Sequence, residues 1–190
     1  MADGSCKVTW EEIMHLPEET RPEIIDGYPF QKSAVKRGHA VTHGAIREAL
    51  GPAMRLGLRD GWLITIEEDV RLSPTAYVRP DLAGWRLSRL AAGVDEWPTT
   101  QLPDWVCEVL SPSNAAYDRG PKMAAYARAG VPWAWLADPD QRTVEVFELV
   151  AGRWTLVGCY GVDDTLALRP FDETVVVVAD LFGPPVVAQP

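Results

Sequence analysis

The sequence predicts an α/β (α+β) fold in which a central mixed β-sheet is flanked by helices. Two observations predict it. Residues 104–137 have the pattern strand, helix, strand, and a crossover of this kind joins parallel strands. Elsewhere, short apolar segments are joined by turn residues such as Asp26-Gly27 and Ala151-Gly152, which connect antiparallel strands. A sheet that contains both parallel and antiparallel strand pairs is a mixed sheet, and the predicted helices would cover its faces.

The elements of the N-terminal half are indicated by capping residues, turn residues and hydrophobic periodicity. Thr9 and Glu12 have the spacing of a capping box that begins a short helix. Gly44 and Pro52 weaken a longer helix whose apolar residues recur at helical spacing. Pro80 lies within a predicted strand and favours a kink or a sheet edge there. The predicted elements are a helix at 9–14, a hairpin at 23–30, a helix at 38–54 and strands at 62–66, 69–72 and 77–85.

The C-terminal half begins with a strand that is apolar on both faces. Asp104 to Leu110 has this character, which is typical of a central strand covered on both sides. The following helix tolerates Pro121 because we place it in the first turn, and Gly130 is a favourable C-cap. The predicted elements are a strand at 104–110, a helix at 118–130 and strands at 131–137, 143–149, 153–159 and 174–178. The last three of these strands are expected to form one antiparallel set.

Length and composition predict a single domain, residues 1–190, with flexible tails at 1–6 and 183–190. A hydrophobic content of 47% over 190 residues is ordinary for a soluble globular protein. No apolar run approaches the roughly 18 residues that a membrane helix needs, and the N-terminus lacks the pattern of a secretory signal. The 3 cysteines are widely spaced and odd in number, which predicts reduced thiols and a cytoplasmic location.

The net charge of −9 argues against an avid nonspecific nucleic-acid binder, because such proteins depend on phosphate contacts made by basic residues. Any interaction with nucleic acid therefore needs a local basic groove, a metal ion or a second subunit. The charge remains compatible with a nuclease that binds its substrate briefly.

Three polar residues stand out because of their settings. Asp81 follows Pro80, Glu108 interrupts an apolar strand, and Lys122 opens the next helix. A carboxylate inside an apolar strand costs several kcal/mol unless a partner compensates its charge. Each residue also has a simpler interpretation: a loop cap for Asp81, a structural salt bridge for Glu108 and a solvated lysine, paired at the surface with Asp118, for Lys122.

Together the three residues suggest a metal-dependent phosphodiesterase site. Asp81 and Glu108 are suitable ligands for Mg²⁺, with Mn²⁺ as a substitute, and such an ion activates water and neutralises phosphate charge. Lys122 would stabilise the phosphate charge or orient the attacking water. Asp118, Lys122 and Tyr126 are spaced at i, i+4 and i+8, so they share a helix face that can look back at Glu108.

Three segments resemble the Uma-two family of putative restriction endonucleases, within the PD-(D/E)XK nuclease superfamily. They are 79–85 (RPDLAGW), 104–113 (DWVCEVLSPS) and 118–139, which contains Lys122. The resemblance covers about residues 20–182. It implies a restriction-endonuclease-like fold, a Mg²⁺-dependent endonuclease site that acts on DNA, catalytic Asp81, Glu108 and Lys122, and metal ligation by Asp81 and Glu108. Fold analogy also suggests a homodimer.

One departure from the superfamily motif concerns the lysine expected two residues after the second acid, where this chain has Leu110. The resemblance implies that Lys122 replaces it from the following helix. The departure and the acidic charge also motivate a second hypothesis, a catalytically inactive nuclease-fold protein that acts as a binding or assembly module. The position of the Lys122 amine relative to the two carboxylates discriminates between the two.

Two histidines, His39 and His43, are four residues apart on a predicted helix. This spacing can bind zinc, but the metalloprotease pattern needs a glutamate where Ala40 stands. Because the same helix face carries apolar residues, we interpret the pair as having a packing role. The resemblance includes a helical His-Gly, so we place His43 near the site as a substrate-binding residue in contact with phosphate, and Tyr126 as a second one.

Overall fold

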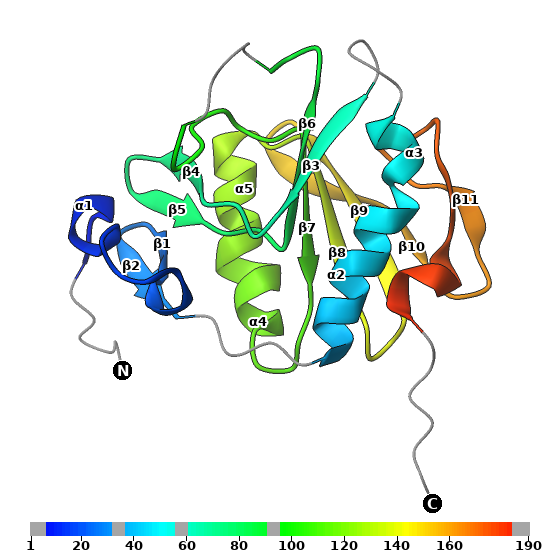
Figure 1. Cartoon of the computed structure of the whole chain (residues 1–190), viewed down its shortest axis with the longest axis horizontal. Coiled ribbons are helices and arrows are strands. Elements are labelled where there is room, and N and C mark those ends of the chain that lie inside the picture. Colours follow the sequence, from blue (N-terminus) through cyan, green and yellow to red (C-terminus); the bar gives the residue numbers. More distant parts are fainter. Residues whose placement is uncertain (1–6, 32–36, 56–60, 91–95, 184–190) are drawn as a thin grey trace, which may run out of the picture.

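A six-stranded mixed sheet forms the middle layer of the computed structural model, which describes residues 7–31, 37–55, 61–90 and 96–183 (Figure 1). β7 and β8 are parallel, and the other neighbouring pairs are antiparallel. The predicted mixed sheet flanked by helices is confirmed. In spatial order the strands are β10 (Arg153–Tyr160), β9 (Thr143–Val150), β8 (Trp133–Asp138), β7 (Trp105–Val109), β6 (Leu82–Arg86) and β3 (Trp62–Ile66).

Helical segments connect the parallel strands β7 and β8. They are α4 (Ala115–Tyr117), the π-helical turn η2 (Asp118–Lys122) and α5 (Met123–Ala129). The predicted placement of Pro121 in a first turn is corrected, because the helical segment begins at Ala115 and the proline lies inside η2. A proline has no N–H for the α-helical ladder, and the wider π turn accommodates it. Gly130 ends α5 at φ 88°, as its predicted role as C-cap requires.

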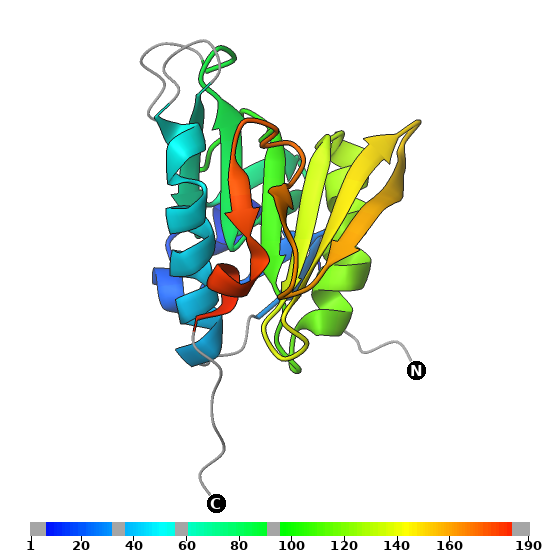
Figure 2. The ribbon, with the colours of Figure 1, turned by 90° about the vertical axis from the view of Figure 1, so that its right-hand side faces the viewer.

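Each face of the large sheet is covered by a separate hydrophobic layer. Alternate residues of β7 enter different layers: Cys107 and Val109 pack on one side, Val106 and Leu110 on the other. Glu108 therefore points to the side of Val106 and Leu110, where α5 packs. The opposite side is covered by α2 (Arg37–Ala49), α3 (Gly51–Met54) and the 3₁₀ helix η3 (Val178–Phe182), as Figure 2 shows from the side.

A four-stranded antiparallel sheet lies beside α5, next to two short helices at the N-terminal end. The predicted strand 77–85 is corrected, because it is two strands in different sheets. Pro80 cannot donate to a strand ladder, and the chain leaves the small sheet at Arg79 and enters the large one at Leu82. The elements are α1 (Trp10–Ile13), η1 (Glu18–Thr20), β1 (Glu23–Ile25), β2 (Tyr28–Phe30), β4 (Val70–Ser73) and β5 (Ala76–Val78).

The last predicted strand is also placed differently. β12 (Val175–Val177) pairs with β11 (Thr165–Ala167), which was not predicted, in a separate two-stranded sheet and not with β9 and β10. The predicted tails lie outside the described residues except Gly183, whose carbonyl accepts a hydrogen bond from Arg142. None of the helices in the described residues is long and apolar enough to cross a membrane.

Candidate active site

Asp81 directly precedes β6, and Glu108 lies on the neighbouring strand β7. The last pair of the β6–β7 ladder at this end joins Leu82 to Cys107, so each acid stands one residue beyond that pair. Both carboxylates are buried. Asp81 Oδ2 accepts a hydrogen bond from the Val109 backbone amide at 2.7 Å, which fixes the carboxylate against the end of β7. Because the chain passes from the small sheet to the large one at Pro80, Asp81 lies next to β7, the strand that carries Glu108.

Glu108 is bound by two side chains from the helical crossover. Lys122 Nζ donates to Glu108 Oε2 at 2.9 Å, and the Tyr126 hydroxyl donates to Oε1 at 2.5 Å. Asp118, Lys122 and Tyr126 are all buried, so the predicted shared helix face is confirmed. The simpler interpretation of Lys122 as a solvated lysine is wrong, because its exposed fraction is 0%.

The Lys122 ammonium has two further partners. Nζ lies 2.9 Å from Glu23 Oε1 and donates to the Arg79 carbonyl at 3.1 Å. Glu23 Oε1 also accepts a hydrogen bond from the Arg79 backbone amide at 2.6 Å. Lys122 therefore ties Glu108 to the chain just before Asp81. Asp69, which binds the Arg79 guanidinium at 2.9 Å, holds this segment from its other side.

Glu23 was missed as a site residue, although the sequence carried the signal. It stands directly before Ile24 and Ile25 in a strand whose three residues are all buried. A carboxylate in such a strand needs a compensating partner, which is the same argument that singled out Glu108. The proximity of the hairpin to the helical crossover could not be read from the sequence.

Opposing influences set the ionisation of this network. Burial is the largest single influence on the pKa of Lys122, and it lowers this pKa. The surrounding carboxylates, Glu108 and Glu23 foremost, raise it by more in total, so the pKa of Lys122 lies well above its usual value of 10.5. Burial and the Glu108 charge raise the pKa of the Tyr126 phenol well above 10.0. Near neutral pH the site therefore holds a charged ammonium and a neutral phenol that donates to Glu108.

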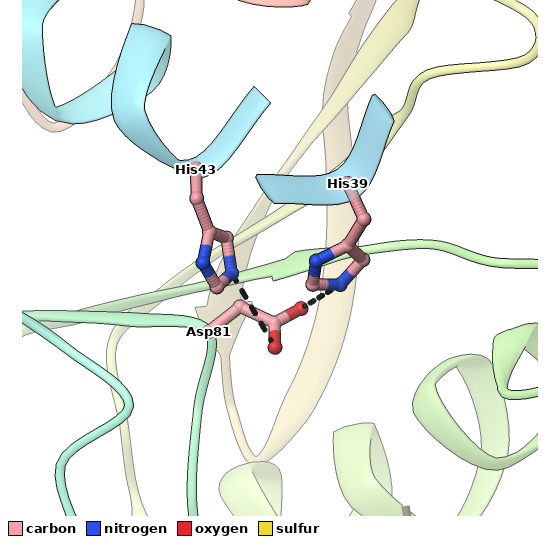
Figure 3. A group of neighbouring side chains, drawn as sticks. All are labelled: His39, His43 and Asp81. Carbon is pink, nitrogen blue, oxygen red and sulfur yellow. Dashed lines mark hydrogen bonds and ion pairs between the residues drawn. The ribbon is translucent and has the colours of Figure 1, made fainter. Parts of the chain in front are cut away.

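Two histidines from α2 reach Asp81 from its other side (Figure 3). His39 Nε2 lies 3.2 Å from Asp81 Oδ2, and His43 Nε2 lies 3.5 Å from Oδ1. Both rings are buried, and their centroids are 4.6 Å apart. The packing role inferred for the pair is corrected, since both rings face a carboxylate. His43 is near the site as expected, while its contact with phosphate stays a prediction.

The arrangement can bind a cation and stabilise negative charge in one small region. His39, His43 and Asp81 each offer a ligand atom, and these atoms lie within 4.8 Å of one another. Glu108 is not one of these three ligand residues; it lies on β7 next to the residue paired with Leu82, and it binds the Lys122 ammonium. Leu110, which occupies the motif position of the missing lysine, is packed with Met123 and Tyr126 in the hydrophobic layer around α5. The ammonium that contacts Glu108 comes from Lys122, while its replacement of the motif lysine stays a prediction.

Comparison with known proteins agrees with these observations. A family model, Uma2, described as "Putative restriction endonuclease", matches residues 10–178, which confirms the resemblance found in the sequence. A putative nuclease belonging to DUF820 from Anabaena variabilis has a solved structure that superposes with a TM-score of 0.75 and 22% identity. The superposition covers 92% of this chain and 97% of that chain, and it confirms the fold. No curated protein matches the chain.

Proposed function

The chain belongs to the Uma2 family of putative restriction endonucleases, and we propose on that basis that it is a metal-dependent endonuclease that hydrolyses DNA phosphodiester bonds. The contact between Lys122 and Glu108 carries the proposal. The distance of 2.9 Å, in a fully buried setting, puts an ammonium against the second acid although Leu110 occupies the usual position. A lysine that pointed to solvent would instead have favoured the noncatalytic binding or assembly module.

Asp81 and Glu108 are the residues that would hold Mg²⁺, or Mn²⁺ in its place. Carboxylate oxygens are the ligands that these ions prefer. The buried Nε2 of His43 beside Asp81, which makes no hydrogen bond within the described residues, also fits a site that receives a cation. When bound, such an ion lowers the pKa of a water molecule and neutralises phosphate charge.

Lys122 acts as a fixed positive charge in this proposal. Its raised pKa means that the amine keeps its proton at neutral pH, so it cannot serve as a general base. A charged ammonium held beside the acids can stabilise the negative charge that develops on the phosphate in the transition state. Tyr126 holds Glu108 by its hydroxyl, and its predicted contact with substrate stays a prediction.

The net charge of −9 requires a local basic surface for DNA, and α2 offers one. A hollow of about 630 Å³ begins at Gly44, directly after His43, and its lining includes the exposed Arg47 and Arg55. Glu48 also lines it. The two arginines of this hollow can contact the phosphate backbone while the overall charge keeps binding brief. This supports a DNA substrate that is held transiently.

The test is a cleavage assay on supercoiled duplex DNA, branched DNA and single-stranded RNA, with Mg²⁺, with Mn²⁺ and with excess EDTA. We expect metal-dependent cleavage of DNA by the wild type and its loss in Glu108→Gln. Glu145→Gln is the matched control, because Glu145 pairs with Arg119 at the surface of β9 and should retain wild-type cleavage. Absence of cleavage of every substrate by a folded wild type would contradict the proposal and favour the binding module.

A further inference from the structure

The side chains around Asp81 include two nitrogen donors, which a site for Mg²⁺ alone does not need. His39 and His43 are one helical turn apart on α2, so the helix presents both rings on one face toward the carboxylate (Figure 3). Both are buried, with 6% and 7% of their surface exposed. We infer that His39, His43 and Asp81 form a binding site for one divalent transition-metal ion. The inference shares Asp81 with the proposed nuclease site, and to that extent it rests on the proposed function.

The distances fit a metal ion bound between these residues. Metal–ligand bonds of roughly 2.0–2.2 Å in a tetrahedral zinc site place neighbouring ligand atoms about 3.3–3.6 Å apart. His39 Nε2 lies 3.2 Å from Asp81 Oδ2, in a hydrogen bond that a metal ion would replace, and His43 Nε2 lies 3.5 Å from the other oxygen, Oδ1. Three ligand atoms within 4.8 Å of one another need only small side-chain movements to enclose an ion. Three protein ligands with a fourth position open is the pattern of catalytic zinc sites.

An unsatisfied buried nitrogen supplies independent support. His43 Nε2 is buried and has no hydrogen-bond partner within the described residues, although it points at the Asp81 carboxylate. Leaving a buried polar group without a partner is unfavourable, so such atoms often belong to ligand sites. A metal ion beside Asp81 would use the lone pair of His43 Nε2.

The donor set determines which ions this site prefers. Imidazole nitrogen is a good ligand for Zn²⁺, Co²⁺ and Ni²⁺, while Mg²⁺ takes oxygen ligands and dehydrates reluctantly. We therefore expect Zn²⁺ and Co²⁺ to bind at His39, His43 and Asp81 far more tightly than Mg²⁺, with Mn²⁺ between them in the general order of affinities. Lys122 and Tyr126 lie on the Glu108 side and donate to that carboxylate.

The test is titration of the metal-free full chain with Co²⁺, followed by visible absorption and calorimetry, in the absence of DNA. We expect one Co²⁺ per chain, displaced by Zn²⁺ and resistant to excess Mg²⁺. His43→Asn should weaken binding by about 100-fold or more, since loss of even an outer partner of a ligand typically costs 10–100-fold. The chain has 3 histidines, and His15→Asn is the matched control because His15 is exposed and should bind Co²⁺ like the wild type.

A second measurement keeps the inference testable if a histidine variant folds poorly. Side-chain nitrogen NMR of the wild type should show shifts of His39 and His43 on addition of Zn²⁺, with His15 unchanged. No Co²⁺ binding by the wild type, or binding that is independent of both buried histidines, would overturn the inference. Histidine-dependent binding without DNA cleavage would uphold it while the nuclease proposal fails. Mg²⁺-dependent DNA cleavage without histidine-dependent Co²⁺ binding would overturn the metal-site inference while the nuclease proposal stands.

Discussion

The two acids at the centre of the molecule have different surroundings. Glu108 is held on the α5 side by a lysine and a tyrosine that both donate to it. Asp81 faces two histidines on the α2 side, and the Nε2 atom of His43 makes no hydrogen bond within the described residues. The Glu108 side is thus a network that the folded state needs for stability, while the Asp81 side resembles a ligand site. Substitutions at Glu108 should therefore lower the unfolding free energy strongly, while substitutions at Asp81 should mainly affect ion binding and cleavage.

The largest effect is expected from Glu108→Ala. It removes the main partner of a fully buried ammonium, and breaking a buried ion pair from one side typically costs about 3–5 kcal/mol. Urea unfolding should show this loss of stability, and DNA cleavage should disappear. Glu108→Gln keeps an acceptor and should lose cleavage with a smaller loss of stability. If Glu108→Ala were as stable as the wild type, Lys122 would not depend on this carboxylate.

Tyr126→Phe is expected to have an intermediate effect. It deletes one hydroxyl that donates to Glu108 Oε1, and a hydrogen bond to a charged group contributes about 1.5–3 kcal/mol. The unfolding free energy should fall by that amount, and cleavage should slow without vanishing because Lys122 still binds the carboxylate. Thr155→Ala on the exposed strand β10 offers a control that changes a hydroxyl outside the site. Equal effects of both substitutions would argue against a special role for the phenol.

Alkaline pH should destabilise the protein through the same network. The pKa values of Lys122 and Tyr126 are raised in the folded state, so their stabilising contributions are complete below their usual values of 10.5 and 10.0. Above pH 10 the unfolded chain loses these protons first, and the unfolding free energy falls by up to about 1.4 kcal/mol per pH unit for each group. Tyr126→Phe should have a shallower slope than the wild type. Identical slopes between pH 10 and 11 would contradict the assignment.

The smallest effect on stability is expected from Asp81→Asn. Asparagine can still accept the hydrogen bond from the Val109 amide, so the unfolding free energy should fall by only about 1 kcal/mol. Cleavage should nevertheless be lost, and divalent-cation affinity should drop, because the charge that attracts the ion is gone. A loss of stability as large as that of Glu108→Ala would remove the difference between the two sides.

Much of the fold followed from local signals in the sequence. The capping box at Thr9, the Asp-Gly hairpin and the C-cap at Gly130 each specify a local backbone conformation, and the structure has all three. The break at Pro80 was interpreted as a kink or a sheet edge within one strand, because the sequence does not show that two sheets meet there. β11 was missed because a strand of 3 residues carries too little alternation to be recognised without its partner β12.

The site residues that could be predicted were charged side chains within apolar segments, which are expected to be buried. Glu108 stood out in an apolar strand, and its partners followed from helical spacing and from the resemblance to the family. Glu23 and His39 could not be placed, because their roles depend on contacts across 99 and 42 residues of chain to Lys122 and Asp81. The homodimer expected from fold analogy stays a prediction, since the structure contains one chain.

The most direct test of a metal-dependent site at these acids is a crystal structure of the full chain with Mn²⁺ and a short DNA duplex, recorded with anomalous scattering. We predict an anomalous peak at the Asp81 carboxylate within reach of Glu108, with a phosphate near Lys122. The same experiment on Asp81→Asn should lose the peak. A Mn²⁺ peak confined to surface carboxylates, with DNA bound away from Lys122, would contradict the account.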